Sequence, residues 1–147
     1  WECEKANFLV FGKASIEPYE EWTATQVGEQ LHQAYPNLLL EMRDKYFRVT
    51  TRANVADIVL KGYVRWMEYL AEFRDCDDFA LEFVMHLARY TLNSVFIVYG
   101  PSPRAYHAFN LVVCIDGLLM VEPQFDFVNT APVPPGLVGY APEKWVI

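Results

Sequence analysis

The stretch HAFNLVVCIDGLLMVEP, residues 107–123, decides the fold class of this chain. Two apolar runs flank Asp116 and Gly117, and an Asp-Gly pair between such runs is a strong signal of a β-hairpin turn. With SVFIVY before it, the stretch predicts an antiparallel sheet, with strands over 94–99, 107–115 and 118–125. We expect a proline-rich loop to follow and EKWVI, 143–147, to form a last short edge strand.

Upstream of this predicted sheet, the apolar residues recur at helical intervals. They predict helices over 18–34, 54–73 and 76–91, with a break at Arg74 and Asp75 between the last two. The segment between the first two helices is ambiguous between a helix and a short strand over 46–50. Helices followed by strands predict an α+β domain in which one helix packs on an antiparallel sheet.

The composition bounds the size of the domain and its partners. The 147 residues are 53% hydrophobic, so we expect a single domain over 1–147. Because the chain starts with Trp1, we expect it to be processed or cut from a longer protein. A net charge of −7 disfavours nucleic acid and anionic lipid as partners, and no apolar run approaches the ~20 residues of a membrane span. We expect a soluble domain of unknown compartment.

The cysteines single out one candidate nucleophile. Cys3, Cys76 and Cys114 are odd in number and lack CxxC spacing, which argues against a disulfide framework and a zinc site. Cys114 lies in an apolar strand, where a buried thiol is expected. Cys76 begins a predicted helix with Asp75 as its N-cap, and a helix N-terminus favours a thiolate.

A thiol nucleophile needs a base and a group that orients the base. His32 and His86 fall inside predicted helices, whereas His107 begins a strand directly after a loop, so His107 is the best candidate base. Glu122 interrupts an apolar strand at its end, where a carboxylate is costly without a partner. Glu122 is therefore the candidate for the orienting acid.

The predicted hairpin puts His107 and Glu122 on one face but not side by side. A two-residue turn at Asp116 and Gly117 sets His107 opposite Asp126 and leaves Glu122 four residues off, roughly 13 Å along the strand. Glu122 then requires a longer loop or a bulge. Asp126 is its rival, with Gln124 behind it.

Two motifs carry a resemblance to a known family. DCDDFAL (75–81) with HAFNLVV (107–113) and DGLLMVEP (116–123) resembles the papain-like and transglutaminase-like cysteine peptidase superfamily, in particular the bacterial transglutaminase-like cysteine peptidases. Their motif has Cys followed by an acid at a helix start, a His-Ala strand, and an acid that ends the next strand. The acid there is usually Asp or Asn, and Glu is similar to the protease-like C-terminal domain of a mushroom agglutinin. The resemblance covers about 73–126.

The resemblance implies a fold and an activity. It implies a papain-like or transglutaminase-like fold, with Cys76 as nucleophile, His107 as base and Glu122 as orienting acid. The implied function is a thiol-dependent hydrolase that cleaves amide bonds through an acyl-enzyme, without a required cofactor. No glutamine shortly before Cys76 matches the oxyanion residue of papain-like enzymes.

Other functions stay open at this point. A transglutaminase would use an amine as acyl acceptor, and a peptidoglycan amidase or endopeptidase would also begin a helix with Asp-Cys. Cys76 is in helical phase with Ala80, Phe83 and Leu87, so a catalytically silent binding or dimerisation module is the alternative of another class. The expected partners are a protein, peptide or cell-wall peptide substrate and a neighbouring domain.

Three aspartates beside the thiol work against thiolate formation. Asp75, Asp77 and Asp78 surround Cys76, and like charges raise the pKa of a thiol. Arg74 could pair with one of them. Alternatively, the three carboxylates could bind Ca²⁺, a cation that prefers oxygen ligands, although their spacing is not that of a standard calcium loop.

Overall fold

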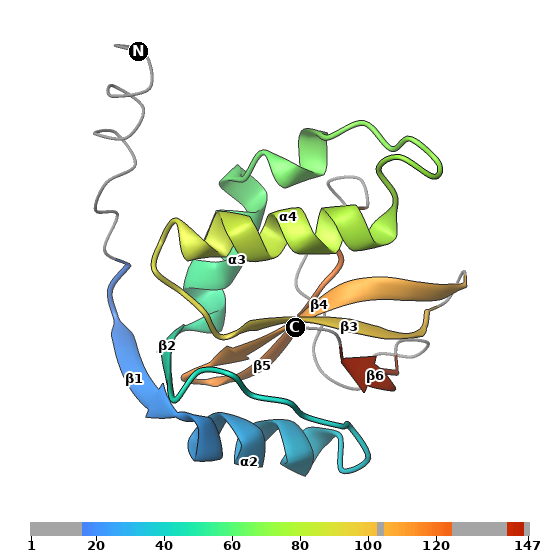
Figure 1. Ribbon diagram of the computed structural model, residues 1–147. Coiled ribbons are helices and arrows are strands. Elements are labelled where there is room, and N and C mark those ends of the chain that lie inside the picture. Colours follow the sequence, from blue (N-terminus) through green and yellow to red (C-terminus); the bar gives the residue numbers. More distant parts are fainter. Residues whose placement is uncertain (1–15, 103–104, 125–140, 146–147) are drawn as a thin grey trace.

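The computed structural model describes residues 16–102, 105–124 and 141–145. Within them, helices and antiparallel sheets form a small α+β fold, which confirms the predicted class (Figure 1). The helices are α2 (Ala24–Ala34), α3 (Arg52–Lys61), α4 (Cys76–Ala88) and a short 3-10 turn, η1 (Val64–Trp66). One sheet pairs β1 (Tyr19–Thr23) with β2 (Tyr46–Thr50), and the other has the order β5 (Gly117–Val121), β4 (Tyr106–Cys114), β3 (Val95–Pro101), β6 (Lys144–Trp145).

The four-stranded sheet is covered on both faces (Figure 1). Helices α3 and α4 pack on one face, and α2 with the β1–β2 sheet lies on the other. Residues of β4 alternate between the two: Val112 joins the α3–α4 cluster, whereas Leu111 and Val113 join the α2–β2 cluster. Strand β4 is therefore buried on both sides along most of its length.

Helix α4 starts and packs as the sequence predicts. Asp75 is the N-cap, and its backbone N–H donates to the Asp78 carboxylate at 3.2 Å. Phe79, Phe83 and Leu87 recur at intervals of four and are buried in the α3–α4 cluster. This packing fixes the direction of α4, so its first residue, Cys76, lies near the start of β4 (Figure 1).

The β4–β5 hairpin turns one residue earlier than predicted. Cys114 pairs with Gly117, so the turn residues are Ile115 and Asp116 rather than Asp116 and Gly117. Gly117, at φ +127°, uses its conformational freedom as the first residue of β5. The Asp116 carboxylate accepts the backbone N–H of Arg52 at 2.8 Å and pairs with its guanidinium, which anchors the turn to α3.

Two predicted helices are too long. In the first, Tyr19–Thr23 is strand β1, because Thr23 and Gln26 form a capping box that begins α2 only at Ala24. In the second, α3 ends at Lys61 and Gly62 caps it in an extended conformation. A Cβ at Gly62 would lie 2.9 Å from both Ile58 O and His86 Nε2, so only glycine fits where the chain leaves α3.

The remaining elements agree in kind and differ in length. Helix α4 ends at Ala88, the ambiguous segment forms β2, and the last predicted strand is β6, which pairs with β3 at Val98 and Tyr99. Strand β5 ends at Val121, before Glu122. Cys3, Asp126 and most of the proline-rich loop lie outside the described residues. No helix in the described part of the chain is long and apolar enough to span a membrane.

Candidate active site

His107 and Glu122 form a tight pair at one end of the sheet. Their atoms His107 Nε2 and Glu122 Oε2 are 2.6 Å apart, and the side chains are only 11% and 2% exposed. The second carboxylate oxygen, Oε1, accepts the backbone N–H of Gln124 at 3.2 Å. Both oxygens of Glu122 are therefore held, and the carboxylate sets the orientation of the imidazole.

The corrected hairpin register explains why Glu122 reaches His107. Val121 pairs with Asn110, and continuing this register past the end of β5 places Glu122 opposite Phe109. His107 is two residues from Phe109 on the same face, a separation of about 7 Å along the strand instead of 13 Å. This diagonal distance is within the reach of the two side chains. The bulge or longer loop that the sequence calls for is unnecessary.

Cys76 lies against the residue that follows His107. Its half-buried side chain packs on the buried cluster of Ala80, Ile97 and Ala108, and its sulfur interacts with the backbone N–H of Ala108. Side chains alternate along a strand, so His107 and Ala108 point to opposite faces of β4. Thiol and imidazole thus approach β4 from two sides, just where β5 has ended in the described residues.

The environment of Cys76 disfavours a resting thiolate. Burial is the main cause that raises the pKa of Cys76 above its ordinary value, and the charges of Asp75 and Asp77 raise it further. The backbone N–H groups of Ala108 and of Cys76 itself act in the opposite direction. The direction is opposite to the one expected from a helix N-terminus alone. Burial also raises the pKa of Cys114, to about 12.

The acidic residues beside Cys76 form a compact group. Ligand atoms of Asp75, Cys76 and Asp77 lie within 4.8 Å of one another. A hydrogen bond with Asp77 is the main reason that the pKa of Asp75 is raised. Asp78 instead accepts the backbone N–H of Asp75, and Arg74 donates to the carbonyl oxygen of Glu68 at 3.4 Å.

This group is a poor match for calcium. Ca²⁺ takes six to eight oxygen ligands, whereas the group found among the described residues offers two carboxylates and a thiol. Calcium binding at Asp75, Asp77 and Asp78 stays a prediction, and no step proposed below uses it.

Tyr99 is a site residue that the sequence reasoning misses. It pairs with Ala108 across the β3–β4 ladder and packs on the same buried cluster as Cys76. Burial is the main cause that raises its pKa, followed by the nearby charges of Asp77 and Cys76. The sequence does contain a signal for this residue: Tyr99 lies near the end of β3 and shares a strand face with Val95 and Ile97.

Asn110 fastens α4 to the sheet. Its side-chain Nδ2 donates to Ala80 O at 3.0 Å, and the residue is fully buried. Ala80 is one turn after Cys76, and Asn110 is three residues after His107. This hydrogen bond therefore fixes the helix that carries the thiol relative to the strand that carries the imidazole.

Comparison with known proteins shows a likeness of fold. No protein-family model matches the sequence, and no curated protein matches it. Among solved structures, the PSL1a–E64 complex has a TM-score of 0.58 at 21% identity over 76% of this chain. Polyporus squamosus lectin bound to the human-type influenza-binding epitope Neu5Acα2-6Galβ1-4GlcNAc has a TM-score of 0.57 at 20% identity over 77%.

These neighbours are longer proteins. This chain spans about half of each, 49% and 48% of their lengths. At such identities the likeness concerns the fold alone. It agrees with the mushroom agglutinin part of the resemblance in the sequence. The chain is thus similar in fold to about half of each of these proteins.

Proposed function

We propose that this domain is a thiol-dependent hydrolase of amide bonds, with a papain-like or transglutaminase-like arrangement of Cys76, His107 and Glu122. One observation carries the proposal: a carboxylate that is 2% exposed lies 2.6 Å from an imidazole nitrogen. The next residue along the strand, Ala108, directs its backbone N–H toward the Cys76 sulfur. The proposed nucleophile is the first residue of α4, the proposed base lies at the start of β4, and the proposed orienting group follows the end of β5.

Burial of Glu122 supports a functional role. Removing a carboxylate from water is costly, and an ion pair at this depth is often no more stabilising than apolar residues of similar volume. Glu122 follows a strand of apolar residues, where such a replacement would be simple. The pair fits the need to hold an imidazole in one tautomer, with Nε2–H donating to Glu122 and Nδ1 as the basic nitrogen.

The raised pKa of Cys76 determines the order of the steps. The thiol attacks the substrate carbonyl while His107 Nδ1 takes its proton, so a resting thiolate is not needed. Backbone N–H groups at the start of α4 stabilise the oxyanion. The imidazolium then protonates the leaving amine. Water attacks the resulting thioester, gives a proton to His107, and releases the acid and the thiol.

One fold neighbour suggests a labelling reagent for the test. It is described as a complex with E64. E64 is an epoxide that alkylates activated thiols, so it is a suitable probe of Cys76.

The proposal is tested by turnover of a peptide library and by E64 labelling of wild type, Cys76→Ala and Cys76→Ser. We expect thiol-dependent cleavage, loss of both signals in the two variants, and an E64 adduct on Cys76 but not on Cys114. Cys114 is 0% exposed and serves as the internal control. Turnover that survives Cys76→Ala, or absence of both turnover and adduct, would overturn the proposal.

The acyl acceptor and the substrate need separate arms of this experiment. A labelled amine is incorporated only if the enzyme is a transglutaminase, whereas hydrolysis releases free acid. Cell-wall fragments assayed beside casein distinguish a peptidoglycan amidase from a protein hydrolase. EDTA followed by Ca²⁺ in the casein assay tests the calcium prediction, which fails if turnover is unchanged.

A binding module without catalysis is the second candidate, because the fold neighbours include a lectin bound to a sialylated glycan. Binding of Neu5Acα2-6Galβ1-4GlcNAc to this domain, combined with no turnover and no E64 adduct, would favour it. Equal binding by wild type and Cys76→Ala is expected in that case, since the thiol would play no part.

A further inference from the structure

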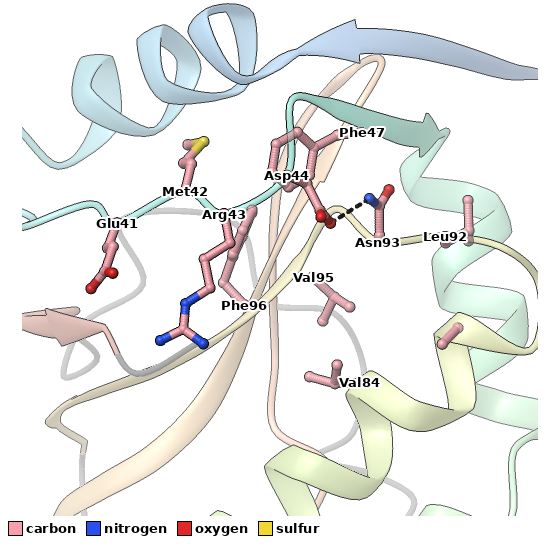
Figure 2. Close-up of a pocket in the computed structure, with 11 residues that line it drawn as sticks. Glu41, Met42, Arg43, Asp44, Phe47, Val84, Leu92, Asn93, Val95 and Phe96 are labelled. Carbon is pink, nitrogen blue, oxygen red and sulfur yellow. Dashed lines mark hydrogen bonds between the residues drawn. The ribbon is translucent and has the colours of Figure 1, made fainter.

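One hollow lies along the helix that carries Cys76 but is separated from the thiol by core residues. It has a volume of about 200 Å³ and lies between the C-terminal half of α4, the start of β3 and the segment that precedes β2 (Figure 2). Along α4 and β3, buried Ala80 and Ile97 separate its lining residues Val84 and Val95 from the end of α4 that carries Cys76. A peptide bound at Cys76 therefore needs another surface.

The loop that leads into α4, residues 66–73, offers such a surface. This aromatic loop projects from the fold at the end of α4 that carries Cys76 (Figure 1). Backbone hydrogen bonds close it, since Arg74 N–H donates to Leu70 O at 2.7 Å and Leu70 N–H donates to Arg74 O at 3.1 Å. The Arg74 guanidinium also donates to Glu68 O at 3.4 Å. The hydrogen bonds that shape the loop therefore do not require its apolar side chains to be buried.

The large apolar side chains of the aromatic loop are exposed. They are Trp66, Tyr69, Leu70 and Phe73, and Phe73 is 86% exposed. Single exposed apolar residues are ordinary, but a group of them in one loop is typical of a binding surface. Their exposure lowers solubility and adds nothing to the core, so contact with a ligand is the physical reason that fits it best.

The aromatic loop ends close to the thiol. Three residues of chain lead from Phe73 to Cys76, so their Cα atoms are at most about 11 Å apart. Arg74 and Asp75, which lie between them, are only partly buried, so no core residue intervenes along this path. An extended peptide with its scissile carbonyl at Cys76 reaches Phe73 with a side chain about two or three residues away.

The charges around the aromatic loop indicate the rest of the ligand. Exposed carboxylates lie within it and just after it, on Glu68, Glu72, Asp77 and Asp78. Arg74 is the only basic residue in 66–78. A complementary ligand therefore carries lysine or arginine beside its apolar side chain. A second copy of this chain, with a net charge of −7, and an anionic membrane would both be repelled.

We propose that the aromatic loop is a substrate-recognition surface, and that it selects peptides with an apolar side chain next to a lysine or arginine, two or three residues from the bond that Cys76 cleaves. The inference rests on the proposed function and adds a substrate class to it. The apolar side chain packs on Phe73 and Tyr69, and the cation lies beside the carboxylates of Glu68 and Glu72.

The test compares kcat/KM for peptides that carry a phenylalanine–lysine pair at successive distances from the scissile bond, with alanine elsewhere. We expect a maximum two or three residues away, with a gain of about tenfold or more. Phe73→Ala should flatten the maximum, and Glu72→Lys should remove the gain from lysine. Tyr46→Ala on β2 and Glu29→Lys on α2 change an exposed aromatic and an exposed acid elsewhere and should leave the profile unchanged.

Two further measurements separate failure of the recognition surface from failure of the enzyme. Iodoacetamide labelling of Cys76 should be equal in wild type, Phe73→Ala and Tyr46→Ala, because this reagent is too small to contact the loop while it reacts. Fluorescence anisotropy of the same peptides with Cys76→Ala, alone and combined with Phe73→Ala, reports binding without turnover. Thiol-dependent turnover that is equal in wild type and Phe73→Ala overturns the recognition surface alone. No turnover, with peptide binding that Phe73→Ala weakens, overturns the hydrolase and supports the loop as a peptide-binding surface.

Other occupants of the aromatic loop are detected by sedimentation. We expect a wild-type chain and Phe73→Ala to sediment alike, and neither to bind phosphatidylcholine vesicles. A dimer or a vesicle complex that is lost in Phe73→Ala, while kcat/KM stays unchanged, would assign the loop to a second copy or to a membrane and overturn its role in substrate recognition.

Discussion

Glu122 is the residue whose surroundings leave least room for substitution. His107 donates to one of its oxygens and the backbone N–H of Gln124 to the other, so the side chain faces two donors. A carboxylate accepts both hydrogen bonds, whereas an amide presents one acceptor and one donor. Glutamine at this position therefore keeps both bonds only if the imidazole changes tautomer, so that Nε2 accepts from the amide and Nδ1 carries the proton.

We accordingly expect Glu122→Gln to lower kcat by about 100-fold or more while KM changes little, because Nδ1 then carries a proton and cannot take the one on the thiol. The free energy of unfolding should also fall by about 1–3 kcal/mol, because hydrogen bonds to a neutral amide are weaker than those to a carboxylate. Peptide turnover and urea unfolding measure the two effects. Gln124→Ala keeps the backbone N–H and is the matched control, and a wild-type kcat in Glu122→Gln would remove Glu122 from the mechanism.

Asp77 influences the thiol by its charge alone. Its side chain is exposed, and its negative charge contributes to the raised pKa of Cys76. We expect Asp77→Asn to move the pH profile of Cys76 alkylation by iodoacetamide to lower pH, so that the rate at pH 8 rises. Asp57→Asn, which removes an exposed acid on α3, is the control. The electrostatic account is wrong if both variants match the wild-type profile.

At the scale of an element, helix α4 is determined by local interactions at its start and by distant contacts along its inner face. Its N-cap, acidic first turn and apolar stripe are all local, which is why the sequence predicts its start correctly. Its inner face also holds His86, which is 7% exposed and has no hydrogen-bond partner for either ring nitrogen. The ring packs edge-on against Tyr63 and Tyr90, with centroids 5.1 and 5.7 Å away.

His86 should make the fold sensitive to mild acid. Burial, followed by the charge of Arg89, lowers the pKa of His86 below 6.5, while Glu82 acts in the opposite direction. As the pH falls below 6.5, His86 binds a proton in the unfolded chain before it does so in the folded chain. The free energy of unfolding therefore decreases. We expect His86→Leu to lose less unfolding free energy than wild type between pH 7.5 and pH 5.5 in urea titrations. An equal loss in both proteins would contradict this assignment.

The elements that the sequence gets wrong depend on distant partners. Tyr19–Thr23 is a strand only because β2 lies beside it, more than twenty residues later. Helix α3 stops at Gly62 because His86 of α4 occupies the space that a side chain would need. No local sequence pattern predicts either contact. In both cases tertiary packing overrides the secondary-structure propensity of the segment.

The pairing of His107 with Glu122 is predicted better than the turn that brings the two residues together. His107 and Glu122 follow from their polar character at the ends of apolar strands. Their distance does not, because a shift of the turn by one residue changes the hairpin register by two. The raised pKa of Cys76 cannot be predicted from the sequence either. Its largest cause is burial, and that burial depends on how α4 packs on β3 and β4.

At the scale of the whole molecule, the proposed chemistry depends on how one layer sits on another. Asn110 contributes to that placement at a cost, since its Oδ1 is buried without a partner. A residue that ties α4 to β4 while carrying an unsatisfied oxygen is better suited to positioning than to stability.

We expect Asn110→Leu, a replacement of similar shape, to keep the free energy of unfolding within about 1 kcal/mol of wild type. It should lower kcat about tenfold, because Cys76 is less well placed relative to His107. Reaction of Cys76 with iodoacetamide, which needs no such placement, should stay unchanged. Loss of activity in proportion to loss of folded protein would show a purely structural role.

The alternation of β4 between two apolar clusters has a consequence for melting. Val112 and Cys114 belong to one cluster, and Phe109, Leu111 and Val113 to the other, so neither layer can come apart while the strand keeps its conformation. The described domain should therefore behave as one cooperative unit. In a calorimeter, we expect a single endotherm whose van't Hoff enthalpy equals the calorimetric one.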